Sequence, residues 1–200
     1  PTWFWPDMVG GSQRNRLRLN EILAHKAGGK LLEVGCGRGD FLTLAAARFQ
    51  VEGIDASEYA VSQAHPTVRA NVSKVDIEQD QFPDGYYDVI VAFNVLEHLK
   101  APDLAIQKIH QRLAPCGMVF GSVPHNAHLV GSVYTWITNY FDKTHCSTYA
   151  PDHWHKLFQE AGFSEIRLFG EVALGPNMAI YIQSAYWRNI LLNLMFECCK

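Results

Sequence analysis

The sequence predicts an α/β fold: a doubly wound, mostly parallel sheet of seven strands, or six if the last is missing, with helices on both faces. Three observations favour it. Strand-like apolar runs alternate with helical segments from residue 30 to residue 123. The run YDVIVAF at 87–93 is almost continuously apolar, as in a central parallel strand. The stretch LLEVGCGRGDF at 31–41 passes from a strand through three alternating glycines into a helix.

The elements of the first part follow in order from the spacing of apolar residues. A leading amphipathic helix is expected over Ser12–His25, ended by Gly28-Gly29. Strands are then expected at 30–34, 51–54, 72–75, 87–93 and 118–123. Helices between them are expected at 38–49, 57–64 and from about 102 to 113.

The regular pattern lapses between Pro124 and Tyr149, where 133–141 predicts a short helix. So long a connection inside a compact domain is usually functional. A helix should begin near Pro151 and a sixth strand should cover 164–169. The end stays open. Either 178–182 is the closing strand, or a helix at 187–196 precedes a strand that the chain lacks, and the second is preferred.

The length of 200 residues fits one domain with four parts: residues 1–28 as a helical lid, 30–123 as a cofactor-binding half, 124–149 as a substrate insert, and 150–200 as a C-terminal part. With 48% hydrophobic residues and a formal charge of −3, no broad basic face is available for nucleic acid. No apolar run would span a bilayer, and the first six residues lack the features of a signal peptide.

The five cysteines show no regular spacing, which argues against a disulfide framework and for a reducing, cytoplasmic location. Cys198 and Cys199 are adjacent, which does not suit a simple zinc knuckle. His125 and His128 could pair, but nothing else in the sequence supports a metal there. The sequence therefore predicts no metal site.

Two acidic residues end neighbouring strands beside the glycine loop. Asp55 closes the second strand, where a carboxylate can accept both hydroxyls of a ribose, although it could also cap the next helix. Asp76 follows the third strand and could accept from an adenine amine. A pyrophosphate would lie badly beside Glu33 and Asp40, whereas a cationic sulfonium cofactor suits this acidic rim.

With these features the chain resembles the class I S-adenosylmethionine-dependent methyltransferases, which have a Rossmann-like fold, and within them the small-molecule group of types 11 and 23. The matching segments are LLEVGCGRGDF (31–41), VEGIDASEYAV (51–61), VDIEQDQFPDGYYDVIVAFNVLEHL (75–99), LAPCGMVFGSVP (113–124) and DKTHCSTYAPDHWHKLFQEAGF (142–163). The resemblance implies S-adenosyl-L-methionine as cofactor and S-adenosyl-L-homocysteine as product.

The resemblance also implies roles for particular residues. The residues that it places around the cofactor are Glu33, Gly35, Cys36, Gly37, Asp55, Ala56, Asp76, Ile77, Phe93 and Asn94. Methyl transfer needs a base only if the acceptor carries a proton. His145 and His98 are the candidate bases, and Asp142 could orient His145.

We therefore expect an enzyme that methylates a small molecule, with oxygen as the preferred acceptor atom. Two alternatives stay open: a nicotinamide-dependent oxidoreductase, and a catalytically silent module that binds the cofactor. The oligomeric state is not determined by the sequence, and a dimer is one of the options.

Overall fold

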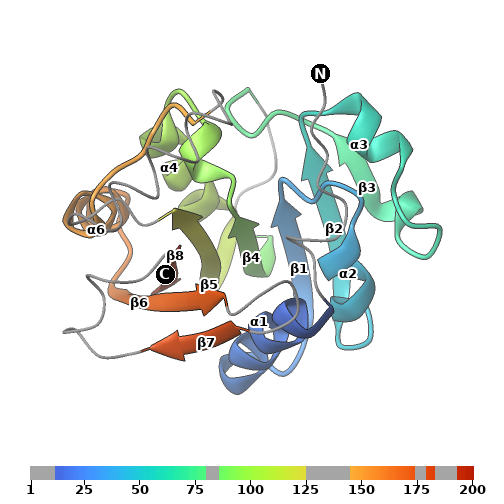
Figure 1. The fold of residues 1–200 in the computed structure, drawn as a ribbon, viewed down its shortest axis with the longest axis horizontal. Coiled ribbons are helices and arrows are strands. Elements are labelled where there is room, and N and C mark those ends of the chain that lie inside the picture. The colour runs from blue at the N-terminus through green and yellow to red at the C-terminus, as the bar shows by residue number, and fades with distance from the viewer. Residues whose placement is uncertain (1–11, 80–85, 125–144, 174–178, 183–192) are drawn as a thin grey trace.

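The computed structural model describes residues 12–79, 86–124, 145–173, 179–182 and 193–200. Within them, eight strands form one sheet in the order β3-β2-β1-β4-β5-β8-β6-β7 (Figure 1). The strands are β1 (Gly29–Val34), β2 (Phe49–Asp55), β3 (Val72–Lys74), β4 (Tyr87–Phe93), β5 (Leu113–Pro124), β6 (Glu165–Ala173), β7 (Ala179–Ile182) and β8 (Asn193–Cys199). The helices are α1 (Ser12–His25), α2 (Asp40–Ala45), α3 (Glu58–Ser62), α4 (Pro102–Arg112) and α6 (Pro151–Glu160), with 3₁₀ turns η1 (Arg69–Asn71) and η2 (Leu96–His98).

The strands from β3 to β5 are parallel, so their carboxyl ends meet at one edge of the sheet. The arrows of β1, β4 and β5 point to this edge in Figure 1. Val34, at the end of β1, is in register with Ile54 of β2 and Ala92 of β4. The strand order reverses at β1, and open α/β sheets bind their ligands in the crevice beside such a reversal. The glycine loop begins at this point.

Two hydrophobic cores cover the two faces of the sheet. Successive residues of β1 point to opposite faces, so Leu31 and Leu32 enter different cores. The first core includes Trp154 and Phe158 of α6 together with residues of α4. The second is closed by residues of α1 and α2. Covering both faces explains the nearly continuous apolar sequence of β4.

The prediction for the C-terminal part was wrong in two respects. Residues 193–196 belong to strand β8 rather than to a helix, and β8 closes the sheet between β5 and β6, antiparallel to both. The strand that the sequence suggested was absent is therefore present. Leu194, Met195, Phe196, Glu197 and Cys198 are all buried, so the strand has no exposed face. A short, mostly apolar run without alternation resembles a buried helix.

Two other predictions near this end had different outcomes. The predicted strand at 178–182 exists as β7, but it pairs with β6 at the outer edge and not with β5. Residues 187–192 and the predicted helix at 133–141 lie outside the described residues. None of the helices that the structure describes is long and apolar enough to cross a membrane.

Elsewhere the predicted order was confirmed, with shifted boundaries. Helix α2 ends at Ala45, well before Phe49, because Phe49 already begins β2 and is buried. Strand β5 begins earlier than predicted, at Leu113, and its register against β4 is irregular between Tyr87 and Val89. The irregularity lies near Cys116, which has a positive φ of 60°.

Candidate functional site

The glycine loop joins β1 to α2 with a backbone that only some residues accept. Gly35 and Gly37 have φ values of 68° and 54°, in the left-handed region that glycine enters without strain. A Cβ at Gly35 would lie 2.2 Å from Cγ2 of Val95, whereas one at Gly37 would meet no atom within 4 Å. The amide of Gly35 donates to the carbonyl of Ile54 over 2.8 Å. The loop is thereby fixed against the end of β2.

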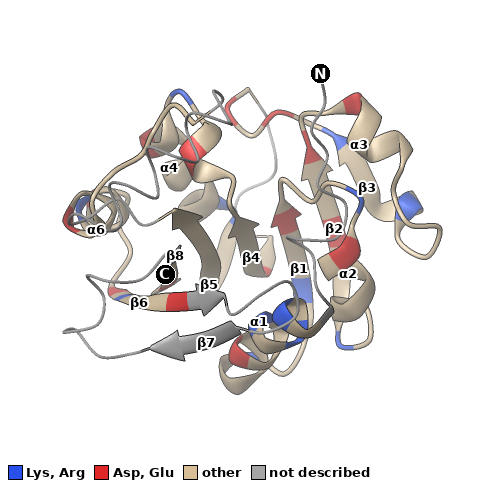
Figure 2. Cartoon of the chain, viewed as in Figure 1, with Lys and Arg blue, Asp and Glu red and all other residues tan. Residues whose placement is uncertain are grey.

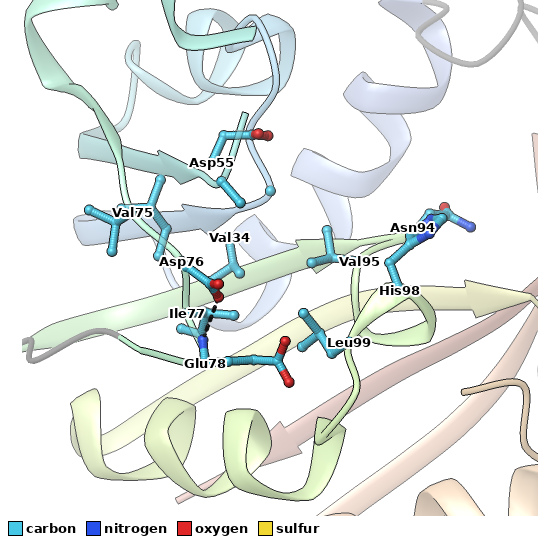
Figure 3. A pocket seen from close by; sticks show the side chains of 13 residues that line it. Val34, Asp55, Val75, Asp76, Ile77, Glu78, Asn94, Val95, His98 and Leu99 are labelled. Atoms are coloured by element: carbon cyan, nitrogen blue, oxygen red, sulfur yellow. Dashed lines mark hydrogen bonds between the residues drawn. The ribbon is translucent and has the colours of Figure 1, made fainter. Parts of the chain in front are cut away.

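A cavity of about 370 Å³ opens beside this loop, at the carboxyl edge of the sheet (Figure 3). Residues from β1, β2 and η2 and from the segments after β3 and β4 contribute to its wall. The lining residues are Val34, Gly35, Ile54, Asp55, Ala56, Val75, Asp76, Ile77, Glu78, Asn94, Val95, His98 and Leu99. Acidic residues mark the carboxyl ends of β1 and β2 in Figure 2.

Asp55 connects the end of β2 to the two loops beside it. Its Oδ2 accepts from the amide of Gly37 and its Oδ1 from the amide of Ser57, both over 2.8 Å. The hydroxyl of Ser57 in turn caps α3 by accepting from the amide of Ala60. The capping role that was the alternative for Asp55 therefore belongs to Ser57. Each carboxylate oxygen accepts more than one hydrogen bond, so Asp55 keeps capacity for ligand hydroxyls.

Asp76 and Ile77 form the opposite wall of the cavity. Oδ1 of Asp76 accepts from the amide of Glu78 over 2.9 Å, as Figure 3 shows, and Oδ2 accepts from Nε2 of Gln79 over 3.1 Å. These bonds hold the carboxylate at the rim. Ile77 is buried in the α4 and α6 core and presents an apolar surface to the cavity. Asp76 thus provides a hydrogen-bond acceptor, and Ile77 a hydrophobic contact, for a flat ring.

Glu33 lies at the end of β1 and is only 6% exposed. Among the described residues, its Oε2 makes no hydrogen bond. Burial raises the pKa of Glu33 well above its ordinary value, and the nearby charges of Asp40 and Asp55 raise it further, while Arg18 opposes them. A buried carboxyl held this way would be stabilised in its ionised form by a cationic ligand.

Asn94 follows β4 with a positive φ of 55° and lines the cavity. Its Oδ1 accepts from the hydroxyl of Ser122 over 2.9 Å, and its amide donates to the Ser122 carbonyl over 2.8 Å. These two bonds tie the residue to the end of β5. Asparagine tolerates the left-handed region better than most residues, which explains its presence at this position.

Arg18 of α1 is a residue that the sequence analysis did not single out. Its guanidinium lies 4.1 Å from the ring centre of Phe93, and Nη2 is 3.4 Å from the hydroxyl of Ser122. Arg14, one turn earlier, forms a buried ion pair with Glu171 of β6, which Arg18 approaches to 3.8 Å. One feature of the sequence could have pointed to these residues: Arg14 and Arg18 lie four positions apart in a predicted helix that has an apolar stripe.

The candidate bases His98 and His145 meet beside η2. His98 lines the cavity, and its ring centre is 4.7 Å from that of His145. The amides of Cys146 and Ser147 both donate to the carbonyl of Glu97 over 2.9 Å, which holds this segment beside η2. Asp142 lies outside the described residues.

The structure thus brings most of the predicted residues to one cavity. Gly35, Asp55, Ala56, Asp76, Ile77, Asn94 and His98 line it. Glu33 and Gly37 do not line it but contact or influence the residues that do. Cys36 and Phe93 pack into the α1 and α2 core, so their side chains act on the site through packing.

The sheet order, the glycine loop at the strand reversal and the acids after β2 and β3 define the class I methyltransferase fold. A family model described as a methyltransferase domain, Methyltransf_23, matches residues 11–168. The chain belongs to this family.

Particular relatives agree with this assignment. The ubiquinone biosynthesis O-methyltransferase of Pseudomonas syringae pv. tomato is 36% identical over 118 residues, which cover 54% of this chain and 50% of that protein. The chain spans about half the length of the curated relatives it matches. The fold resembles a methyltransferase of Thermotoga maritima, with a TM-score of 0.75, 16% identity and coverage of 93% and 89%.

A further fold match is phosphoethanolamine N-methyltransferase 2 of Haemonchus contortus in complex with S-adenosyl-L-methionine, with a TM-score of 0.69, 22% identity and coverage of 80% and 39%. The cofactor of the methyltransferase class, S-adenosylmethionine, fits the residues of the cavity by its chemistry. Asp55 and Asp76 offer acceptors to hydroxyl and amine groups, and Ile77 offers an apolar surface. The buried Glu33 suits a cationic ligand.

Proposed function

We propose that this chain transfers a methyl group from S-adenosylmethionine to an oxygen atom of a small-molecule acceptor. The observation that carries the proposal is the single cavity that contains both the acids suited to an adenosine and the imidazole of His98. The similarity of the chain to ubiquinone biosynthesis O-methyltransferases supports oxygen as the acceptor.

Within this proposal the two ends of the cofactor contact different residues. Asp55 would hold the ribose hydroxyls, and Asp76 with Ile77 would hold the adenine. Glu33, Gly35 and Asn94 would surround the methionine part. Holding the cofactor and the acceptor in line accounts for much of the acceleration expected of such a site. His98 and His145 lie where the acceptor would enter.

When bound, S-adenosylmethionine supplies a methyl carbon that forms a bond to the acceptor oxygen while its bond to sulfur breaks and sulfur keeps the electron pair. A hydroxyl acceptor must also lose its proton, and an imidazole accepts protons near neutral pH. We assign this proton to the pair formed by His98, which lines the cavity, and His145, whose ring centre is 4.7 Å from that of His98.

The test combines calorimetry with a panel of acceptors. We expect S-adenosylmethionine and S-adenosylhomocysteine to bind and NAD not to bind. Incubation with matched phenols, catechols and amines, followed by mass spectrometry, should show methylation of the hydroxyl compounds first. Binding of NAD without either sulfur compound would contradict the proposal. Cofactor binding without transfer to any acceptor would favour the silent module instead.

A further inference from the structure

We propose that Glu97, His98 and His145 form a binding site for a divalent metal ion at the acceptor end of the cavity. One ligand atom from each residue lies within 4.8 Å of the other two. Metal bonds to imidazole nitrogen and carboxylate oxygen are about 2.0–2.2 Å long. The three atoms therefore need to approach by roughly 1 Å to bind one ion, which rotation of partly exposed imidazoles allows.

The backbone explains why these residues meet. The carbonyl of Glu97 accepts from the amides of both Cys146 and Ser147, and the hydroxyl of Ser147 donates to the carbonyl of Leu99 over 2.9 Å. Three hydrogen bonds thus attach the segment after residue 144 to η2. His145 is placed beside this turn although it is distant in the sequence. Such fixed backbone geometry suits a preorganised site.

The two proposed ligands in the turn η2, Glu97 and His98, differ in their exposure. The side chain of Glu97 is 1% exposed, whereas that of His98 is 33% exposed and lines the cavity. The Nε2 atom of His98 is 4.0 Å from Oε1 of Glu97. A carboxylate buried this deeply is stabilised by positive charge nearby, in addition to the contacts that it already makes. A divalent cation between the carboxylate and the two imidazoles would supply that charge.

The donor set indicates the kind of metal. Two imidazoles and one carboxylate occur in catalytic zinc sites, which keep an open coordination position, and in sites of other divalent transition metals. Magnesium and calcium prefer oxygen ligands. The structure thus favours Zn²⁺ or a similar transition ion. Because His98 lines the cavity, the open positions would face the space for the acceptor.

The role of the ion in catalysis deepens the proposed function and rests on it. Binding of the ion does not depend on the proposed function. An acceptor hydroxyl coordinated at the open position would have a lower pKa and would release its proton to water. The oxygen would then form its bond to the methyl carbon as the carbon–sulfur bond breaks. His98 and His145 would act as ligands, so the ion would replace a free imidazole as the means of activating the hydroxyl.

The experiment uses protein without an affinity tag, stripped with a chelator and titrated with Co²⁺. We expect visible absorption bands that saturate at one Co²⁺ per chain, and displacement of the Co²⁺ by Zn²⁺. His145→Ala and Glu97→Gln should each lower the affinity by roughly 100-fold or more, since changes to outer-shell partners alone cost 10–100-fold. His155→Ala, which removes an exposed imidazole of α6, should leave it unchanged.

Affinity for S-adenosylhomocysteine, measured on every variant, checks that the fold is retained. His145 is only partly buried, so its alanine variant decides the outcome if Glu97→Gln does not fold. Absence of stoichiometric Co²⁺ and Zn²⁺ binding by the wild-type chain would overturn the proposal, as would equal affinity in His145→Ala. If the chain binds neither Co²⁺ nor Zn²⁺ but binds S-adenosylhomocysteine and transfers methyl groups, the metal site fails and the proposed function stands. If the chain binds Co²⁺ at these residues but binds neither S-adenosylmethionine nor S-adenosylhomocysteine, the metal site stands and the proposed function fails.

Discussion

The amide of Gly37 donates to Oδ2 of Asp55 over 2.8 Å, which joins the glycine loop directly to the end of β2. The other oxygen of Asp55 accepts from Ser57 at the start of α3. One carboxylate therefore fixes the loop after β1 and the loop after β2 in relation to each other. The residue that we assign to the ribose thus also shapes the loop assigned to the methionine part.

Asp55→Ala should weaken binding of S-adenosylhomocysteine by a few kcal/mol, because each lost charge-assisted hydrogen bond contributes about 1.5–3 kcal/mol. Asp55→Asn retains one carbonyl oxygen and should lose less. Calorimetry on both variants measures the difference. Asp103→Ala, on α4 and outside the cavity lining, is the control. Equal affinity of Asp55→Ala and wild type would remove Asp55 from the cofactor site.

His145→Ala should slow methyl transfer to a hydroxyl acceptor by roughly 10²–10⁴-fold, the usual contribution of a general acid or base. Cofactor affinity should change little, because His145 lies beside His98 and is not among the residues that line the cavity with Asp55 and Asp76. Single-turnover rates and calorimetry separate the two effects. Weaker cofactor binding with unchanged turnover would indicate a role in the cofactor site instead.

Glu33→Gln should stabilise the cofactor-free protein, and increasingly so as the pH rises. The folded pKa of Glu33 is raised above its ordinary value near 4.5, mainly by burial, so the folded state holds the proton more tightly than the unfolded state. Wild-type stability is then lost as the pH rises from about 4.5 towards the raised pKa, by up to about 1.4 kcal/mol per pH unit.

Urea unfolding of wild type and Glu33→Gln at a series of pH values from about 4.5 upward tests this sign. The two curves should meet at the acidic end. In the same variant, affinity for S-adenosylmethionine should fall, since glutamine cannot balance a cationic ligand. A wild-type chain that gains stability over Glu33→Gln with rising pH would show that Glu33 is ionised and well paired in the fold.

Glu171→Gln should destabilise the fold by about 3–5 kcal/mol, the usual cost of removing one partner from a buried ion pair. The side chain of Glu171 is fully buried, and Arg14 also donates to it from Nε over 3.0 Å. The comparison is Glu160→Gln, which breaks the exposed pair with Lys156 on α6 and should cost less than about 0.5 kcal/mol. Equal urea midpoints for the two variants would contradict the prediction.

The sequence predicted the strand order of residues 30–123 well because its signals are local. The glycine loop, Asp55 and Asp76 each follow directly from a strand, and the carboxyl ends of parallel strands meet at one edge. Strand β4 was predicted with its observed bounds because its residues are apolar on both faces. Strand β8 has the same property but was mistaken for part of a helix. No alternation distinguished it, and only its pairing with β5 and β6 settles the matter.

By itself, then, the sequence determined the order of the strands and helices up to β6 and several of the residues that line the cavity. Backbone conformation and strand ends depend on neighbours along the chain. The tertiary structure alone decided which distant side chains meet. It placed Arg18 against Phe93, and it brought His145 to His98 through two amides that bind the carbonyl of Glu97. Contacts of this kind depend on how separate elements pack, and no spacing in the sequence encodes them.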